Sequence, residues 1–319
     1  MVELRHLIGR VARSKAHTVL IYGETGTGKG LVARMIHRLS ARAEAPFVDI
    51  NCAAIPSALL ESELFGHEKG SFTGAVGRKQ GLLEAAEGGT FFLDEVRELD
   101  PVMQAKILTL LDTRRIRHVG GVHPVEVDVR FIAATNRILL GEVKAGHFRD
   151  DLYYRLQVIA INIPPLRDRG DDILLLADRF LNHYNALHGS RMRSFDPEVQ
   201  RILRAHLWPG NVRELENLIE RICLLEDGER VEVEHLPNRI LRETSEVVAT
   251  RPALASAVGS AKGLGESKDF HLATQNFQRA LIEQALNACQ GSLALAAADL
   301  GLTRHALRHH MTKLDIRWN

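Results

Sequence analysis

The sequence predicts an α/β domain built on a parallel sheet with helices on both faces, then a helical subdomain and a small all-α domain. Four short apolar runs alternate with helical patterns in the first half of the chain, at residues 17–22, 46–50, 90–95 and 129–136. Strands that alternate with helices pair in parallel and are covered on both faces. The helical periodicity of the second half adds the other two parts.

The pattern changes at 163-IPPLRDRGDD-172, where two prolines interrupt the chain. Helical patterns then follow at 171–187, 196–206 and 211–225. Small and polar residues dominate the stretch after residue 240, which predicts a linker before helical periodicity resumes. The expected parts are an α/β subdomain at 1–165, a helical lid subdomain at 166–240, a linker at 241–267 and a helix–turn–helix domain at 268–319.

Composition excludes a disordered chain and a disulfide scaffold. Of 319 residues 45% are apolar, and Lys plus Arg (41) balance Asp plus Glu (40). The cysteines at 52, 223 and 289 are odd in number and far apart, which disfavours disulfides and zinc and fits a reducing cytoplasm. No signal peptide or membrane-length apolar run is present, so we expect a cytoplasmic protein without a membrane partner.

The segment 23-GETGTGK-29 has the G-x-x-x-x-G-K spacing of a phosphate-binding loop between an expected strand and an expected helix. Its backbone N–H groups and the helix N-terminus favour phosphates, and its lysine reaches the outer ones. The alternative, a plain glycine-rich turn, does not account for both spacing and context. The expected nucleotide-binding residues are Gly23, Glu24, Thr25, Gly26, Thr27, Gly28, Lys29 and Gly30.

Gly30 stands where a general P-loop has a Ser or Thr that holds Mg²⁺. The cation must then depend on phosphates, water and another carboxylate. The run 91-FFLDE-95 ends an apolar strand in two acids. Asp94 is expected to orient Mg²⁺ through water, and Glu95 to polarise an attacking water. Two solvated acids at a strand end are the alternative, and the upstream P-loop favours ATP hydrolysis over it.

With these motifs in place, the chain resembles the bacterial enhancer-binding proteins, AAA+ activators of sigma-54 RNA polymerase. The resemblance runs from about residue 10 to 319. Beyond the two motifs above it rests on NCAA at 51–54, ELFGHEKGSFTGA at 63–75, AATN at 133–136, FRDDLYYRL at 148–156, PPLRDR at 164–169 and WPGNVRELEN at 208–217. It implies an ATPase that uses ATP and Mg²⁺.

The resemblance implies a role for 70-GSFTGA-75, because family members carry a GAFTGA loop that touches sigma-54 in the ATP-bound state. Ser71 replaces the family's alanine. A glycine-hinged loop can offer an apolar anchor and a hydroxyl to a partner without harming the core. The alternative is that Phe72 packs on its own domain. The expected sigma-54 contacts are Gly70, Ser71, Phe72, Thr73, Gly74 and Ala75.

The resemblance also implies roles for polar residues around the nucleotide. Asn51 matches the switch asparagine that holds the catalytic glutamate, with a strand-end cap as its alternative. Asn136 matches the sensor I residue near the γ-phosphate, with a turn residue as its alternative. Arg213 matches the sensor II arginine of the lid, with an exposed helix arginine beside Glu214 and Glu216 as its alternative.

Arg149 and Arg155 match the family's arginine fingers, which act in trans. Local ion pairs with Asp150 and Asp151 are the alternative. Fingers given by a neighbour imply self-assembly into a ring, expected to be a hexamer. Gly30 departs from the family as well, which usually has Glu there; neither residue offers a hydroxyl.

The segment 292–316 has helix–turn–helix spacing and resembles the family's Fis-type DNA reader. Gly301 makes the turn, and the packing face is Ala296, Ala297, Leu300, Leu307, Met311 and Leu314. Thr303 can cap the second helix, whose outward residues are Arg304, His305, Arg308 and His309. These five residues are expected to bind double-stranded DNA. An amphipathic hairpin with a solvated basic face is the alternative. The two histidines have metal spacing but no further ligand, so a metal site is rejected.

The expected function is a ring-forming ATPase that binds upstream DNA and remodels the sigma-54 polymerase closed complex into an open one. One alternative is another AAA+ remodelling machine, such as a helicase loader or chelatase, against which the 70–75 loop and the DNA reader argue. The other is a DNA-binding regulator that binds ATP without hydrolysing it. An intact Glu95 with its expected partners argues against that alternative.

Overall fold

The computed structural model describes residues 1–244 throughout, together with positions 279, 282, 286, 292, 293, 296, 297, 307, 308, 311 and 316. The chain divides into two compact units, Met1–Thr244 and Ser245–Asn319. The first unit holds the sheet and the lid, and it ends four residues inside the expected linker. Each unit is described by itself.

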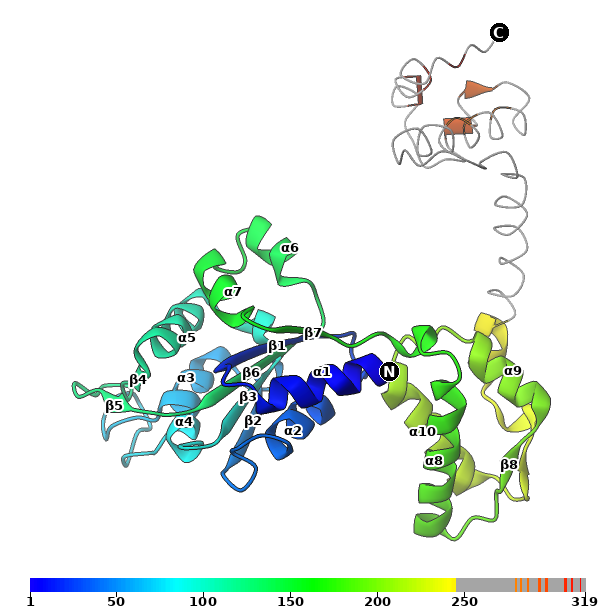
Figure 1. Ribbon diagram of the computed structural model, residues 1–319, viewed down its shortest axis with the longest axis horizontal. Helices are drawn as coiled ribbons and strands as arrows, with labels where there is room; N and C mark the ends of the chain where they lie inside the picture. The colour runs from blue at the N-terminus through cyan, green and yellow to red at the C-terminus, as the bar shows by residue number, and fades with distance from the viewer. Residues whose placement is uncertain are drawn as a thin grey trace. The chain divides into compact units, whose positions relative to one another are not determined.

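The predicted parallel sheet is confirmed, with five strands in the order β2-β3-β6-β1-β7 (Figure 1). The strands are β1 (Thr18–Tyr22), β2 (Phe47–Asn51), β3 (Thr90–Asp94), β6 (Arg130–Thr135) and β7 (Ala160–Asn162). All four strand pairings are parallel; in the register Val19 of β1 lies opposite Ile132 of β6. The sequence had not indicated β7, because three residues with one buried side chain produce no recognisable alternation.

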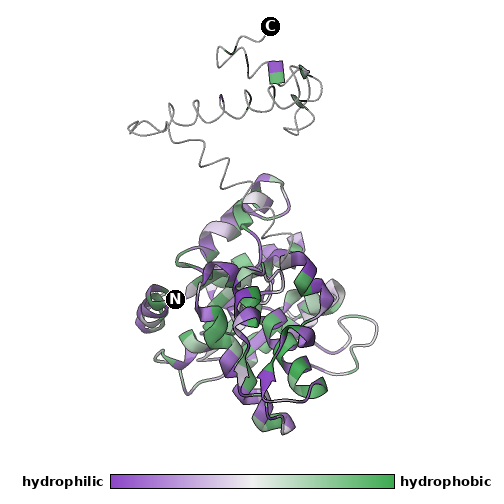
Figure 2. Cartoon of the chain, turned by 90° about the vertical axis from the view of Figure 1, so that its right-hand side faces the viewer, coloured by the Kyte–Doolittle hydropathy of each residue, from purple (hydrophilic) through white to green (hydrophobic). Residues whose placement is uncertain are grey.

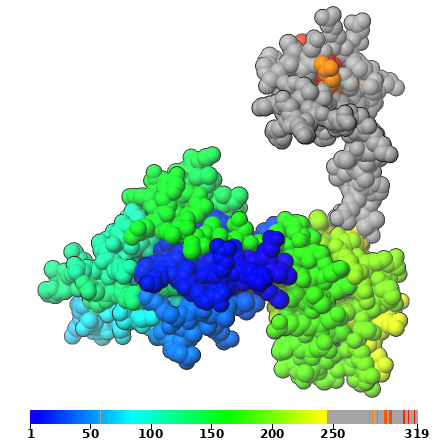
Figure 3. Space-filling model, viewed as in Figure 1, coloured from blue at the N-terminus to red at the C-terminus, as the bar shows by residue number. Residues whose placement is uncertain are grey.

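Successive residues of β1 point to opposite faces, as the period of a strand requires. Val19 and Ile21 pack against α1 (Val2–Arg13) and α2 (Lys29–Arg38). Leu20 belongs to the core of the other face, under α3 (Ser57–Phe65), α5 (Pro101–Thr113) and α7 (Asp150–Leu156). Figure 2 shows that the helices carry both hydrophobic and hydrophilic residues, and Figure 3 shows α1, in dark blue, on the outer surface.

Smaller elements complete the α/β part. They are α4 (Leu82–Ala85), α6 (Leu139–Lys144), the 3-10 turns Cys52–Ala54 and Val96–Glu98, and the antiparallel hairpin of β4 (Arg115–Ile116) with β5 (Val125–Glu126). The loop between α3 and α4 pairs with this hairpin region: Glu68 N–H donates to Val119 O at 3.0 Å and Val119 N–H to Gly66 O at 2.9 Å. The expected sigma-54 loop therefore stands beside a second loop that the sequence had not linked to it.

The lid contains α8 (Asp172–His188), α9 (Pro197–Ala205) and α10 (Asn211–Leu225) around the fully buried Trp208. It also contains the 3-10 turns Leu166–Asp168 and Val233–His235. The expectation of a helical lid is confirmed, with one addition. Strands β8 (Ser194–Phe195) and β9 (Arg230–Val231) pair in parallel, and two-residue strands are too short to alternate visibly.

The C-terminal unit shows the expected packing face at the positions that are described. Ala296, Ala297, Leu307 and Met311 are helical and buried in one cluster, together with Ile282 and Leu286. Leu300, Gly301 and Leu314 lie outside the described residues.

Candidate nucleotide site

A cleft of about 700 Å³ lies between the carboxyl ends of the sheet strands and the lid. Ligands of open α/β sheets bind at this edge. The cleft brings together ten residues that the sequence had singled out: Thr25, Gly26, Gly28, Lys29, Gly30, Asn51, Asp94, Glu95, Asn136 and Arg213. Side chains not expected there also line it. From the lid they are Leu176, Arg179, Phe180, Val212 and Glu216, and from the 3-10 turn after β3 there is Glu98.

The P-loop depends on two glycines with left-handed backbone. Gly26 has φ 80° and Gly28 has φ 97°, a region that residues with a side chain enter at a cost. The turn delivers Lys29 to the first position of α2, where its side chain is buried. Its Nζ donates to Gly23 O at 3.1 Å and lies 3.2 Å from Glu95 Oε1. The lysine is thus held between the loop backbone and the expected catalytic acid.

Glu95 also has left-handed backbone, with φ 53°, which is unusual for a residue with a side chain. Such strain persists only where the surrounding structure imposes it, and it gathers at functional sites. The side chain points to the cleft, where Glu95 Oε2 accepts from the N–H of Asn136 at 3.3 Å. Burial raises the pKa of the neighbouring Asp94, while Lys29 opposes that rise.

The two expected asparagines differ in what they contact. Asn51 lines the cleft, but its Oδ1 accepts from Ala53 N–H at 2.9 Å, so in this structure it caps the 3-10 turn after β2. Asn136 Nδ2 donates to Thr25 Oγ1 at 3.4 Å, which links the end of β6 to the P-loop. Asn136 Oδ1 is buried and has no hydrogen-bond partner within the described chain.

Three side chains of the lid form hydrogen bonds with the P-loop that the sequence had not indicated. Arg167 forks onto the Glu24 carboxylate at 2.9 and 2.7 Å, and this contact lowers the pKa of Glu24. Asn211 Nδ2 donates to Glu24 Oε2 at 3.1 Å and to Thr25 O at 3.0 Å. Arg169 donates to Thr27 O at 2.9 Å. These residues lie in the motifs PPLRDR at 164–169 and WPGNVRELEN at 208–217. These motifs could have indicated the contacts from the sequence.

The two finger candidates lie away from this cleft. Arg149 pairs with Asp151 through bonds of 3.0 and 2.7 Å, which is the local ion pair considered from the sequence. Arg155 contacts Asp112 Oδ1 at 3.1 Å and donates to Leu111 O at 2.9 Å, not to the acids near it in sequence. Neither lines the nucleotide cleft of its own chain.

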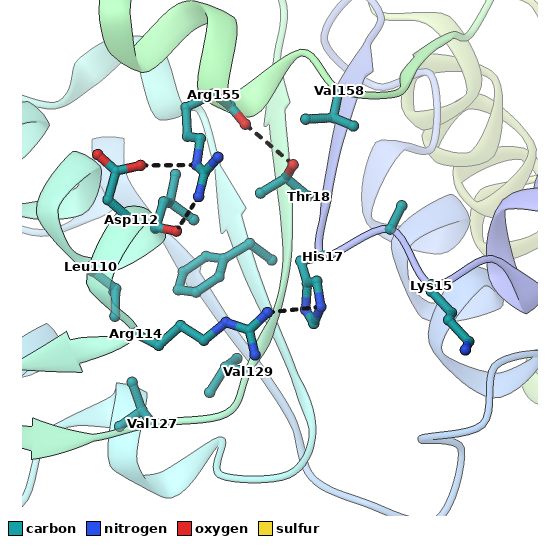
Figure 4. Close-up of a pocket in the computed structure, with 13 residues that line it drawn as sticks. Lys15, His17, Thr18, Leu110, Asp112, Arg114, Val127, Val129, Arg155 and Val158 are labelled. Atoms are coloured by element: carbon teal, nitrogen blue, oxygen red, sulfur yellow. Dashed lines mark hydrogen bonds and ion pairs between the residues drawn. The ribbon is translucent and has the colours of Figure 1, made fainter.

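Arg155 instead lines a separate cavity of about 430 Å³ near the first residue of β1 (Figure 4). Its backbone oxygen accepts from Thr18 Oγ1 at 3.2 Å, and Arg114 contacts His17 Nε2 at 3.0 Å on the other side of the cavity. Thr18 begins β1, whereas the P-loop follows its last residue, Tyr22. The length of the strand therefore separates Arg155 from the P-loop of the same chain.

The 70–75 loop combines exposure with local order. Phe72 is 41% exposed, and its ring stands edge-on to His67 with centroids 5.0 Å apart. Gly70 N–H donates to Ala75 O at 2.9 Å, so the loop closes on itself. Phe72 thus leans on a residue of its own loop and still presents much of its surface to solvent. Gly70 and Gly74 have φ of 80° and 106°, as a tight loop requires.

His118, which the sequence had not singled out, joins the base of this loop to the core. The buried ring contacts Glu68 Oε1 at 2.7 Å through Nδ1 and Glu84 Oε1 at 2.9 Å through Nε2. The hydrogen bond with Glu68 raises the pKa of His118, and Glu84 adds to the rise. No local pattern marks this residue, because its partners lie 50 and 34 positions away.

The residues expected to bind DNA fall mainly outside the described part of the chain. Thr303, Arg304, His305 and His309 are not described. Arg308 is helical and exposed. Among the residues that are described, no group of three or more His, Cys, Asp or Glu side chains forms a metal cluster, and no helix is long and apolar enough to cross a bilayer.

The sheet order, P-loop cleft and helical lid define a nucleotide-binding protein of the AAA+ class. Residues 1–162 match the family described as "Sigma-54 interaction domain", 167–252 the "AAA+ ATPase lid domain" and 275–314 the "Bacterial regulatory protein, Fis family". The chain belongs to the family of sigma-54-dependent transcriptional activators with a Fis-type DNA-binding domain.

Individual relatives agree with this assignment. The chain is 46% identical over 316 residues to the response regulator protein PilR of Pseudomonas aeruginosa, a match covering 99% of this chain and 68% of PilR. It is 44% identical over 318 residues to the nitrogen fixation protein AnfA of Azotobacter vinelandii, of which it covers 56%. A solved structure of NtrX from Brucella abortus in complex with ATP is similar, with TM-score 0.70 and 34% identity over 99% of this chain and 68% of that one.

Proposed function

We propose that this chain hydrolyses ATP in a ring of its own copies and uses the cycle to remodel a sigma-54 polymerase complex at promoters whose upstream DNA it binds. The observation that carries the proposal is the convergence of Lys29, Asp94, Glu95 and Asn136 with the lid residue Arg213 in one cleft. A neighbour in structure, NtrX, is described with ATP bound, which supports ATP as the ligand.

The residues of the cleft fit Mg²⁺ held mainly by phosphates and water. Gly30 offers no hydroxyl, and Asp94 is a carboxylate at the cleft whose raised pKa, due to burial, would fall beside a cation. Bound Mg²⁺ would neutralise charge on the phosphates during transfer. Asp94 would hold it through water, as the absence of a hydroxyl at residue 30 requires.

The chain's own groups then have distinct tasks. Lys29 binds the outer phosphates, which draws its ammonium away from Glu95. The released Glu95 carboxylate orients a water for attack and accepts its proton. Asn136 lines the same space, and its Nδ2, which donates to Thr25 Oγ1, is suited to the γ-phosphate region. Asn51 would leave its cap on Ala53 to act as the switch that holds Glu95.

Hydrolysis needs positive charge beside the outer phosphates. Arg149 and Arg155 do not supply it to the cleft of their own chain, because neither lines that cleft. Both arginines are exposed and paired with exposed acids, contacts that are weak in water, and Arg155 has one further hydrogen bond, to Leu111 O. A neighbouring copy can therefore attract them to its own nucleotide. We infer a closed ring, with six copies as in the family that the sequence resembles.

Coupling to the polymerase is assigned to the loop at 70–75, where Phe72 offers apolar surface and Thr73 a hydroxyl. DNA binding is assigned to the second helix of the C-terminal reader, with Arg304 and Arg308 as base-contacting candidates. Loss of one base contact typically costs about 1–3 kcal/mol of specific binding.

The decisive experiment compares Glu95→Gln with Glu98→Gln. Both acids line the cleft, but only Glu95 contacts Lys29. We expect Glu95→Gln to bind ATP and to lose about 10²–10⁴-fold in phosphate release, the usual contribution of a general base. Glu98→Gln should stay within about threefold of the wild type. Equal turnover of both variants and wild type contradicts the role of Glu95.

The alternative is a DNA-binding regulator that binds ATP without turnover, and the Lys29–Glu95 ion pair is the observation in its favour. It would show ATP binding but no phosphate release by the wild-type ring at any protein concentration. A rise in specific activity with protein concentration, as a ring forms, argues for the proposed function instead.

A further inference from the structure

Helix α8 of the lid presents a basic side chain to the nucleotide cleft that no motif above accounts for. Arg179 lines the cleft together with Leu176 and Phe180, which lie three residues before it and one after it on the same helix. Arg213 of α10 lines the cleft as well. The two lid helices pack side by side (Figure 1), so the lid offers two guanidinium groups to one space.

Arg179 has no hydrogen-bond or ion-pair partner within residues 1–244. Glu216 on the facing helix α10 also lines the cleft, but its carboxylate lies more than 4.0 Å from the Arg179 guanidinium, so the two form no ion pair. Glu216 instead contacts the Tyr184 hydroxyl at 3.5 Å. By contrast, Arg167, the lid arginine that grips the P-loop, is forked onto Glu24. The charge of Arg179 is therefore available to a ligand.

The charges around the cleft show why a ligand anion needs this group. Four carboxylates line the space, those of Asp94, Glu95, Glu98 and Glu216, against three cations, Lys29, Arg179 and Arg213. Lys29 is already paired with Glu95. A polyphosphate entering beside four carboxylates is repelled unless the lid cations offset them. Arginine suits this task, because its planar guanidinium binds phosphate oxygens through two donors and stays charged.

We propose that Arg179 binds the outer phosphates of the nucleotide from the lid side, as a second lid arginine beside Arg213. Lys29, Asp94, Glu95 and Asn136 line the same cleft as Arg179, and they are groups for phosphate and water, which assigns this cleft to the phosphates of the nucleotide. The proposal rests on the proposed nucleotide function and adds to it a contact that distinguishes ATP from ADP. The same contact would make the binding of the lid to the nucleotide depend on the γ-phosphate.

The test measures ATP and ADP dissociation constants by calorimetry, with Mg²⁺, for the full chain. A non-hydrolysable analogue stands for ATP, because the proposed function would otherwise consume it during the titration. Arg179→Ala should weaken ATP binding by about tenfold or more and ADP binding by less than about threefold, since a hydrogen-bonded charge contact is lost only for the outer phosphate. Arg179→Lys should fall between Arg179→Ala and wild type, because it keeps the charge but not the fork.

Two control variants separate this proposal from the function on which it rests. Arg221→Ala removes an exposed arginine of α10 that does not line the cleft, and it should bind both nucleotides as the wild type does. Lys29→Ala should lose both nucleotides. If Arg179→Ala matches Arg221→Ala while Lys29→Ala loses binding, the proposal is overturned and the nucleotide function stands.

Two further results count against the proposal. Equal weakening of ATP and ADP in Arg179→Ala places the contact away from the outer phosphate. Wild-type binding by Lys29→Ala would overturn the nucleotide site itself, and the assignment of Arg179 with it.

Discussion

The contact between the P-loop and the lid can be tested by adding one carbon atom. A Cβ on Gly26 would lie 2.1 Å from the backbone oxygen of Gly210, at the tip of the lid. Ordinary contact begins at 3.4 Å, so the two would have to separate by 3.4 − 2.1 = 1.3 Å. The obstacle is backbone rather than a flexible side chain, and Gly26→Ala must therefore displace the lid tip from the loop.

The cost has two parts. Left-handed backbone at residue 26, with φ 80°, costs an alanine about 1–2 kcal/mol relative to glycine. Displacement breaks the bonds from Val212 N–H to Gly26 O and from Asn211 Nδ2 to Thr25 O, both 3.0 Å long. Each is worth about 0.5–1.5 kcal/mol net, so Gly26→Ala should lower the free energy of unfolding by roughly 2–5 kcal/mol.

Gly28→Ala is the matched control. Gly28 belongs to the same loop and also has left-handed backbone, with φ 97°, but a Cβ there meets nothing within 4 Å. It should cost only the backbone part, about 1–2 kcal/mol. The assay is urea unfolding of nucleotide-free protein in a Trp318→Phe background, followed by the fluorescence of Trp208 buried in the lid. If Gly26→Ala costs no more than Gly28→Ala, the lid does not rest on the P-loop as described.

Three further predictions concern the rest of the cycle. Arg155→Ala should abolish phosphate release alone and regain part of it when mixed with Glu95→Gln protein, because a mixed interface can hold one complete site; failure of all mixtures in which rings form would oppose fingers in trans. Thr73→Ala should keep phosphate release but lose open-complex formation on a sigma-54 promoter, and full promoter opening would remove the loop from the coupling role. His118, whose pKa is raised by Glu68, should stabilise the fold below its ordinary pKa of about 6.5 and progressively less as pH rises through the higher folded value; the difference in unfolding midpoint between wild type and His118→Asn should therefore shrink with rising pH, and a constant difference would refute it.

Much of the site follows from local sequence. The order of glycines and lysine in 23-GETGTGK-29 sets a loop between a strand and a helix, since only glycine enters left-handed backbone at low cost. The acids at 94–95 follow an apolar strand, and the carboxyl ends of parallel strands meet at one edge of a sheet. These two facts already placed Lys29 near Asp94 and Glu95, as the structure shows.

Partners that are far apart in sequence could not be assigned in the same way. Glu24 meets Arg167 and Asn211 across 143 and 187 residues. Arg155 forms an ion pair with Asp112 and not with the acids beside it in sequence, because α5 and α7 pack together under the sheet. No local pattern distinguishes Arg179 from a solvated helix arginine, and only the packing of α8 shows that it lines the cleft.

The sequence by itself determined four of the five strands of the sheet, the P-loop and the helices of the lid, because burial periodicity and backbone freedom are properties of neighbouring residues. The tertiary structure alone decided which side chains face one another across the lid and the loops. A side chain's distant partner depends on how the helices pack over the sheet. Hydrophobic patterning specifies which face of each helix is buried, but it does not specify which residues contact the polar face.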